Sequence, residues 1–203
     1  MRKNLIIFVI FLFATILAKA QTANTIMRDV VNTYTTAKII SADFEMTSSQ
    51  FNVKGNIVMN GNNFRILTDD FKCWYDGKNE WLYTNITGEV NLLEPAREEM
   101  EANNPYLAVM RYNTKYRAVL KSSTNFNYVV ELISRNPYVD MTKVILTINK
   151  KNNQIMEAVA TMIDDTKQTI KFSNYVMNAN MPANTFVFDS KMVPSGTPII
   201  DLR

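Results

Sequence analysis

The sequence predicts a single, mainly β domain that also contains helices, either a sandwich or a barrel. Two observations predict this class: roughly ten short segments alternate apolar and polar residues, and turn-forming residues recur about every 8–12 positions. No repeat, low-complexity run or linker divides the chain. Residues 21–203 are therefore expected to form one domain, long enough to bury its own core.

Residues 1–20 are predicted to be a cleavable signal peptide. Arg2 and Lys3 precede an apolar run from Leu5 to Leu17, and small residues flank Lys19 before the expected cleavage at Gln21. The run is shorter than the roughly 20 residues that a membrane-spanning helix needs. Because Gln21 is not a cysteine, no thioether lipid anchor can form there. We expect a diffusing protein outside the cytoplasm.

The charges and the missing residue types exclude several functions. Without residues 1–20, 19 basic residues balance 19 acidic ones, so there is no electrostatic case for binding nucleic acid. Cys73 is the only cysteine, which excludes an intramolecular disulfide. The sequence contains no histidine, which excludes Ser-His-Asp and Cys-His nucleophilic sites and the usual histidine-containing zinc sites. We therefore predict no catalytic residues, no metal site and no cofactor.

The first element after the signal peptide is predicted to be an amphipathic helix over residues 22–38. Ile26, Val30 and Tyr34 recur at helical spacing, and Thr22 or Asn24 is a suitable N-cap. From residue 39 the apolar period changes to two. Strands are expected at 39–47, 51–59, 64–68, 72–75, 81–84, 90–93, 116–121, 128–133, 143–149, 154–163, 168–175 and 186–188.

An insertion interrupts the strands at about residue 95. Residues 96–102 are rich in glutamate and good helix formers, and residues 106–110 indicate a second short helix after Asn103-Asn104-Pro105. This insertion is the natural candidate for a movable cover.

Only acidic clusters offer catalytic material, at Asp69-Asp70, at Asp164-Asp165 and at Glu94 with Glu98, Glu99 and Glu101. Such clusters are also ordinary turn and helix-start chemistry. The methionines carry more information, since flexible thioethers line sites that fit variable apolar shapes. The alternative interpretation is that they fill the core.

Ordered motifs over nearly the whole chain resemble one known family. They are Ser41-Ala42-Asp43-Phe44, Lys54-Gly55-Asn56-Ile57, Asn63-Phe64-Arg65, Tyr75-Asp76-Gly77-Lys78 with Trp81 and Tyr83, Asn104-Pro105-Tyr106-Leu107, and Thr185-Phe186-Val187-Phe188 with Pro194, Gly196, Ile200 and Asp201. In this order they resemble the periplasmic outer-membrane lipoprotein carriers of the LolA type.

The resemblance implies an incomplete, strongly curved antiparallel β-barrel whose apolar lumen is covered by helices. It further implies a monomeric periplasmic carrier, not an enzyme, that takes acylated lipoproteins from an inner-membrane exporter to an outer-membrane receptor and needs no cofactor. By carry-over and strand alternation, the residues expected to bind acyl chains are Phe44, Met46, Ile57, Met59, Phe64 and Ile66 on the lumen wall, with Tyr34, Leu107 and Met110 on the covering helices.

One departure from the family pattern is visible at Asn60-Gly61-Asn62. Well-known members carry an arginine in this hairpin turn, where it helps to close the lid, and this chain has no basic residue there. Either another contact closes the cover, or the cavity is more open. This departure favours one alternative to the carrier hypothesis, a lipid-sensing or lipid-storing envelope module on the same fold. The acidic clusters leave a second alternative, a histidine-free carboxylate hydrolase.

Overall fold

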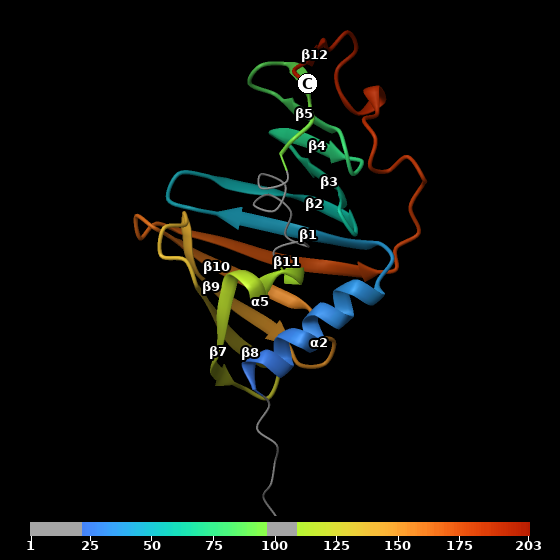
Figure 1. The fold of residues 1–203 in the computed structure, drawn as a ribbon. Coiled ribbons are helices and arrows are strands. Elements are labelled where there is room, and N and C mark those ends of the chain that lie inside the picture. The colour runs from blue at the N-terminus through green and yellow to red at the C-terminus, as the bar shows by residue number, and fades with distance from the viewer. Residues whose placement is uncertain (1–21, 97–108) are drawn as a thin grey trace, which may run out of the picture.

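A single open sheet of twelve strands forms the protein (Figure 1). The computed structural model describes residues 22–96 and 109–203, so the predicted signal peptide lies outside the described residues. The sheet is strongly curved, as the sequence predicted, and its strands follow the order β12-β6-β5-β4-β3-β2-β1-β11-β10-β9-β8-β7.

The strands match the predicted segments closely, with one exception near the C-terminus. They are β1 (Ile40–Thr47), β2 (Asn52–Asn60), β3 (Asn63–Thr68), β4 (Phe71–Tyr75), β5 (Glu80–Thr84), β6 (Glu89–Leu93), β7 (Tyr116–Ser123), β8 (Asn127–Ser134), β9 (Met141–Asn149), β10 (Ile155–Met162), β11 (Lys167–Met177) and β12 (Ile199–Asp201). Neighbouring strands run antiparallel except β12, which pairs with β6 in parallel.

Helix α2 (Ala23–Thr36) crosses the concave side of this sheet (Figure 1). Its N-cap is Thr22, whose Oγ1 accepts a hydrogen bond from the Thr25 backbone N–H at 3.2 Å. The helix buries one face, formed by Ala23, Ile26, Met27, Val30 and Tyr34. The sequence pattern therefore predicted the helix and most of its packing face but missed Ala23 and Met27.

Two local features allow the strands to bend. At Gly55 in β2, a Cβ atom would collide with the Leu67 carbonyl oxygen and lie 2.8 Å from Thr68 Cγ2, so only glycine permits this close approach. In β11, Asn174 has a φ of 50°, and the register with β1 shifts at this point. Asp43 secures this bulge, because its carboxylate accepts hydrogen bonds from Asn174 at 2.8 Å and Asn56 at 2.9 Å.

The convex side of β3–β6 carries a second, smaller core. Trp74, Tyr83 and Val90 are buried there beneath Phe188, Met192 and Val193 of the C-terminal tail. The Phe188 ring packs edge-on against Trp74 with centroids 5.4 Å apart. The Lys72 ammonium donates to the Met192 carbonyl, which adds a polar contact to this cover.

The prediction of a strand at residues 186–188 was wrong. This stretch forms turns, in which the Thr185 N–H donates to Pro182 O and the Val187 N–H to Asn184 O. Phe188 packs on Trp74 of β4 instead of belonging to a strand. The last strand is β12 instead, which extends the sheet beyond β6.

The predicted helix at 96–102 lies outside the described residues except Ala96, and most of the one at 106–110 also does. Val109 and Met110 are helical, and the short helix α5 (Tyr112–Lys115) follows and leads directly into β7. Within the described residues, no helix combines the length and the apolar character that crossing a bilayer requires.

Candidate functional site

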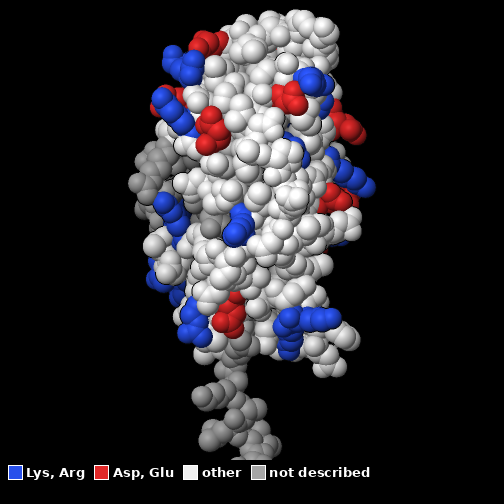
Figure 2. Space-filling model, turned by 90° about the vertical axis from the view of Figure 1, so that its right-hand side faces the viewer, with Lys and Arg blue, Asp and Glu red and all other residues white. Residues whose placement is uncertain are grey.

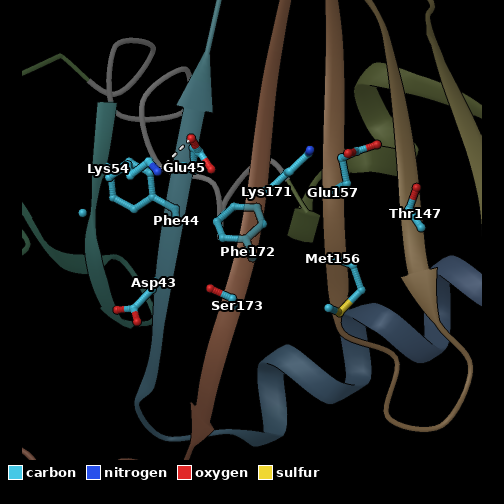
Figure 3. A pocket seen from close by; sticks show the side chains of 11 residues that line it. Asp43, Phe44, Glu45, Lys54, Thr147, Met156, Glu157, Lys171, Phe172 and Ser173 are labelled. Atoms are coloured by element: carbon cyan, nitrogen blue, oxygen red, sulfur yellow. Dashed lines mark ion pairs between the residues drawn. The ribbon is translucent and has the colours of Figure 1, made fainter. Parts of the chain in front are cut away.

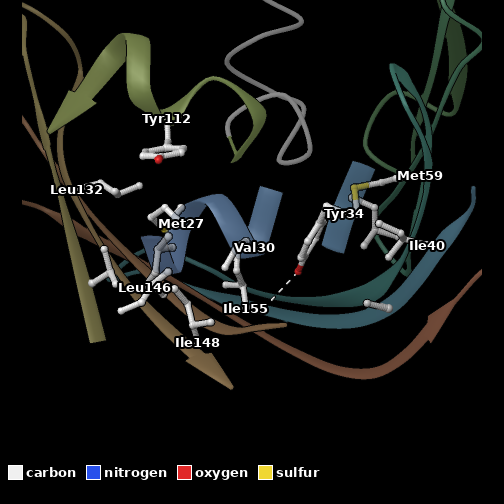
Figure 4. Close-up of a cluster of buried hydrophobic side chains, with 14 of the residues drawn as sticks. Met27, Val30, Tyr34, Ile40, Met59, Tyr112, Leu132, Leu146, Ile148 and Ile155 are labelled. Atoms are coloured by element: carbon white, nitrogen blue, oxygen red, sulfur yellow. Dashed lines mark hydrogen bonds between the residues drawn. The ribbon is translucent and has the colours of Figure 1, made fainter. Parts of the chain in front are cut away.

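The concave face of the sheet is an apolar surface that collects side chains from both halves of the chain (Figure 4). Met27 and Val30 of α2 meet Leu146 and Ile148 of β9 across this interior, and each of the four is at most 4% exposed. Burial of such side chains stabilises the fold by about 1.5–3 kcal/mol each. Helix α2 therefore fills the centre of the concave face.

Most of the residues predicted to bind acyl chains lie on this face. Ile57, Met59, Phe64 and Tyr34 belong to its buried cluster, while the half-buried Phe44, Ile66 and Met110 pack against the cluster. The structure thus brings these seven residues together around α2.

The two remaining predicted residues are placed differently. Met46 alternates onto the same side of β1 as Phe44, but it is half-buried and lies outside the cluster. Leu107 lies outside the described residues. Which of the nine residues contact an acyl chain stays a prediction.

Sequence reasoning missed an aromatic contribution from β11. Phe172 stands opposite Phe44 in the register of β1 and β11, and both rings reach the concave face. Tyr175 also reaches this face, three residues further on, because the bulge at Asn174 resets the alternation. Strict alternation with period two assigns these two aromatic residues to opposite faces, so the pattern alone concealed one of them.

A hydrogen-bonded pair of tyrosines ties α2 to the sheet. The hydroxyls of Tyr34 and Tyr175 lie 3.0 Å apart, and the Tyr175 hydroxyl donates to the Ile155 carbonyl at 2.8 Å. The Ile155 N–H in turn donates to the Tyr34 hydroxyl at 3.3 Å. Burial raises the pKa of both tyrosines, so these hydroxyls remain protonated at neutral pH.

Further contacts secure the C-terminal part of α2 and the residues that follow it. Asn153 donates to the Thr33 hydroxyl at 3.3 Å, and the Lys38 N–H donates to the Asn178 side chain at 2.9 Å. Uncharged hydrogen bonds and apolar packing thus hold α2 against the sheet.

A groove of about 750 Å³ lies on the opposite, convex face (Figure 3). Its lining includes a row in which charges alternate from strand to strand: Lys54 of β2, Glu45 of β1, Lys171 of β11 and Glu157 of β10. The Lys54 ammonium lies 3.2 Å from the Glu45 carboxylate. Opposite charges on neighbouring strands attract each other, which is ordinary sheet stabilisation. Phe44 and Phe172, which pack against the concave cluster, are also among the residues that line this groove.

The acidic clusters behave as turns where they are described. Asp164 accepts hydrogen bonds from the Thr166 N–H at 3.0 Å and the Thr166 hydroxyl at 2.6 Å, which lowers its pKa. Asp165 has a φ of 63° in the same hairpin. Glu98, Glu99 and Glu101 lie outside the described residues. Within the described part of the chain, no three His, Cys, Asp or Glu side chains gather closely enough to hold a metal.

The charged side chains on the face seen in Figure 2 are of both signs and interspersed. No broad area of one sign forms on this face, so it presents no continuous positive field to a polyanion.

Comparisons with known proteins agree with this architecture. A family model described as outer membrane lipoprotein carrier protein LolA matches residues 13–162. No curated protein sequence matches the chain.

Solved structures match at low sequence identity. An uncharacterized conserved protein from Thermus thermophilus has a TM-score of 0.59 and 10% identity, with 88% of this chain and 98% of that chain covered. The MucA/MucB complex of Pseudomonas aeruginosa has a TM-score of 0.50 and 8% identity, with 83% of this chain and 62% of that chain covered. A LolA superfamily protein from Nitrosomonas europaea has a TM-score of 0.43 and 13% identity, with 83% of this chain and 99% of that chain covered.

The two likenesses with TM-scores of 0.59 and 0.50 show the fold. The family match extends over most of the chain, including α2 and the strands β1–β10 that build the concave face. The chain therefore belongs to the family of outer membrane lipoprotein carrier proteins, LolA.

Proposed function

We propose that this protein binds the acyl chains of lipoproteins against its concave face and carries them through the periplasm from the inner to the outer membrane. One observation carries the proposal: the family fold presents a continuous apolar surface beneath a helix, with half-buried aromatic residues at its margin. The proposed role requires no catalysis, because the protein only shields and releases its cargo.

The energetics of an acyl chain explain why such a surface is needed. Each methylene kept from water is worth about 0.8 kcal/mol, so a chain of about 14 methylenes costs on the order of 10 kcal/mol to expose. A diffusing carrier must offset most of this cost. The apolar residues on the concave face supply the matching surface.

Helix α2 occupies the centre of that surface, which makes the described conformation a closed one. Met27 and Val30 of α2 are fully buried between the helix and the sheet, so an acyl chain needs α2 or its neighbours to move aside. Phe44, Phe172 and Ile66 surround the helix without being fully buried, and we propose that the chain first contacts this margin. The tyrosine pair then sets how readily α2 yields.

Native mass spectrometry of protein isolated gently from its own envelope tests the proposal. We expect bound lipoprotein or a mass increment of fatty acyl chains. In a matched in vitro assay, Ile66→Asp should weaken palmitate binding at least about tenfold, because a carboxylate on the concave face opposes apolar contact.

The control is Val176→Asp, on the same sheet at a site 52% exposed, which should bind palmitate normally. Both variants are first checked by thermal unfolding. Unchanged palmitate binding by a folded Ile66→Asp protein would contradict the proposed site.

A second candidate is a lipid-sensing or lipid-storing module that does not hand its cargo on. The uncharged closure of α2 favours it, because the turn at Asn60-Gly61-Asn62 lacks the charged residue that the carrier family uses for release. A transfer assay separates the two: a carrier delivers a labelled acylated peptide to acceptor vesicles containing the outer-membrane receptor, whereas a sensor retains it.

A further inference from the structure

The two edges of the sheet are finished in different ways. At one edge the chain covers β6 with its own β12, pairing Ile199 with Val90 and Asp201 with Leu92. At the other edge β7 pairs with β8 alone among the described residues (Figure 1). An uncovered edge strand presents a row of backbone donors and acceptors to which another extended chain can pair.

Strand β7 has a regular section long enough for such pairing. Five consecutive residues, Tyr116 to Leu120, pair with β8 in register before a bulge between Leu120 and Ser122. This section spans about 17 Å at roughly 3.4 Å per residue. Tyr116, Ala118 and Leu120 pack against the concave cluster, so the edge borders the proposed acyl-chain surface directly.

The surroundings of β7 are strongly basic, although the chain without residues 1–20 is neutral. Between residues 116 and 151, the acidic residues are Glu131 and Asp140, whereas the basic residues are Arg117, Lys121, Arg135, Lys143, Lys150 and Lys151. The Glu131 carboxylate already faces the ammonium groups of Lys121 at 3.3 Å and Lys143 at 3.8 Å, and Glu131 is only 9% exposed.

Other basic residues of this region lie at or near the edge. Arg117 is exposed on β7 itself, and the Lys150 ammonium reaches the far end of the strand, where it donates to the Ser123 hydroxyl at 2.8 Å. A second copy of this chain is a poor occupant, because pairing two β7 strands would bring like charges together. An acidic segment is the complementary occupant.

We propose that the free edge of β7 pairs with an extended, acidic peptide segment of the acylated partner, adjacent to its acyl group. The assignment rests on the proposed function, since the acyl chain would bring the segment to this edge. Backbone pairing along β7 then provides affinity without a fixed sequence, and the basic side chains select acidic segments. The protein would in this way recognise the peptide as well as the lipid.

Four probes separate the contributions of peptide and lipid: a palmitoylated peptide in which Glu alternates with Thr, the same conjugate with Gln for Glu, the acidic peptide without palmitate, and palmitate alone. At low salt, we expect the acidic conjugate to bind about tenfold more tightly than the Gln conjugate. The difference should shrink as salt rises, because exposed charges are screened. Equal affinities of the two conjugates at low salt would overturn the proposal.

Arg117→Glu tests the basic edge. It should weaken binding of the acidic conjugate about three- to tenfold and leave palmitate binding unchanged. The matched control is Lys78→Glu, a 69% exposed position at the far side of the sheet, which should change neither affinity. Equal losses in the two variants would show a general charge effect and overturn the assignment to β7.

Ala118→Pro and Val119→Pro test the backbone pairing. Neighbouring N–H groups in a strand point to opposite sides, so one variant breaks a bond to β8 and the other removes only a free-edge donor. The variant that keeps the wild-type melting temperature is the informative one, and it should lose the preference for the acidic conjugate. If that folded variant keeps the full preference, β7 is not the docking edge.

Failure of the proposed function would give a different result. Suppose that palmitate does not bind but the unacylated acidic peptide binds in an Arg117-dependent way. The assignment of the peptide to β7 is then supported, and the proposed binding of acyl chains is wrong. If anionic vesicles bind in an Arg117-dependent way and the peptides do not, the basic strip serves a membrane and the peptide proposal is wrong.

Discussion

Two covers protect the two faces of the same sheet, and they are built differently. Helix α2 covers the concave face with a long apolar stripe and with hydroxyls that bond across the interface, from Tyr34 to Tyr175. The C-terminal tail covers the convex face of β3–β6 with a few large contacts, chiefly Phe188 on Trp74, and is fastened at its end by β12.

The difference indicates that the covers serve different purposes. The tail buries a small aromatic core of the convex face, so we expect the tail to stabilise the fold. Helix α2 lies on a surface larger than it covers fully, since Phe44, Phe172 and Ile66 remain only half-buried around it. An apolar ligand can therefore compete for the concave face, whereas it gains little by displacing the tail.

The largest effect is expected from Trp74→Ala. Trp74 is 1% exposed beneath the tail, and truncation of a fully buried aromatic residue lowers the free energy of unfolding by about 3–5 kcal/mol. Urea denaturation measures the loss. Phe126→Ala, at a site 77% exposed, is the control and should change stability by less than about 0.5 kcal/mol. A loss as small as that of the control would show that the tail cluster is not a core.

Phe188→Ala should lower the free energy of unfolding by about 1–2 kcal/mol, less than Trp74→Ala because the Phe188 ring is only half-buried. It should also expose the tail to protease while leaving palmitate affinity unchanged. The nearby Val187→Ala, 42% exposed, is the control for cleavage. A weakened affinity for palmitate would mean that the two covers are coupled.

Tyr34→Phe tests the concave cover, because it removes the hydroxyl that ties α2 to the sheet. Loss of this hydroxyl leaves the Ile155 N–H without its acceptor and removes the bond to Tyr175, which costs about 0.5–1.5 kcal/mol. Because only α2 is loosened, we expect faster palmitate uptake by stopped-flow fluorescence, by about fivefold for 1 kcal/mol. Tyr138→Phe, 89% exposed, is the control. Slower uptake would show that the acyl chain does not enter beneath α2.

The sequence predicted much of the fold because most strands have one side facing an apolar interior. Alternation then identifies both the strand and its inward residues, as at Phe44 in β1 and Ile57 in β2. It failed at residues 186–188, where the tail packs on the sheet without joining it, and it missed β12, whose three residues are all exposed. Short edge strands carry little burial signal.

The candidate site was harder to predict for a related reason. The inward positions on β1–β3 follow directly from alternation, but Tyr175 reaches the interior only because Asn174 takes a left-handed conformation. Nothing in a period of two indicates where a bulge will reset the pattern. The closure of α2 was likewise hidden, because the partners Tyr34 and Tyr175 are 141 residues apart in the chain.

High pH should lower the free energy of unfolding, and the share that the Tyr34–Tyr175 pair contributes to this loss is the smallest effect. Burial raises the pKa of Tyr34 and Tyr175 above the ordinary value of 10.0, so the folded protein retains protons that the unfolded chain loses. Their contribution to stability is therefore complete well below pH 10 and declines as the pH rises towards the folded-state values. At pH 10 itself, half-ionisation of the unfolded chain reduces stability by about 0.4 kcal/mol for each tyrosine.

Urea denaturation between pH 8 and pH 10.5 measures this loss, with the Tyr34→Phe/Tyr175→Phe double variant as reference. The double variant should show a shallower decline, since it lacks both buried hydroxyls. If alkaline pH exposes the tail to protease before it speeds palmitate uptake, the convex cover is the weaker of the two, and α2 is not the element that yields.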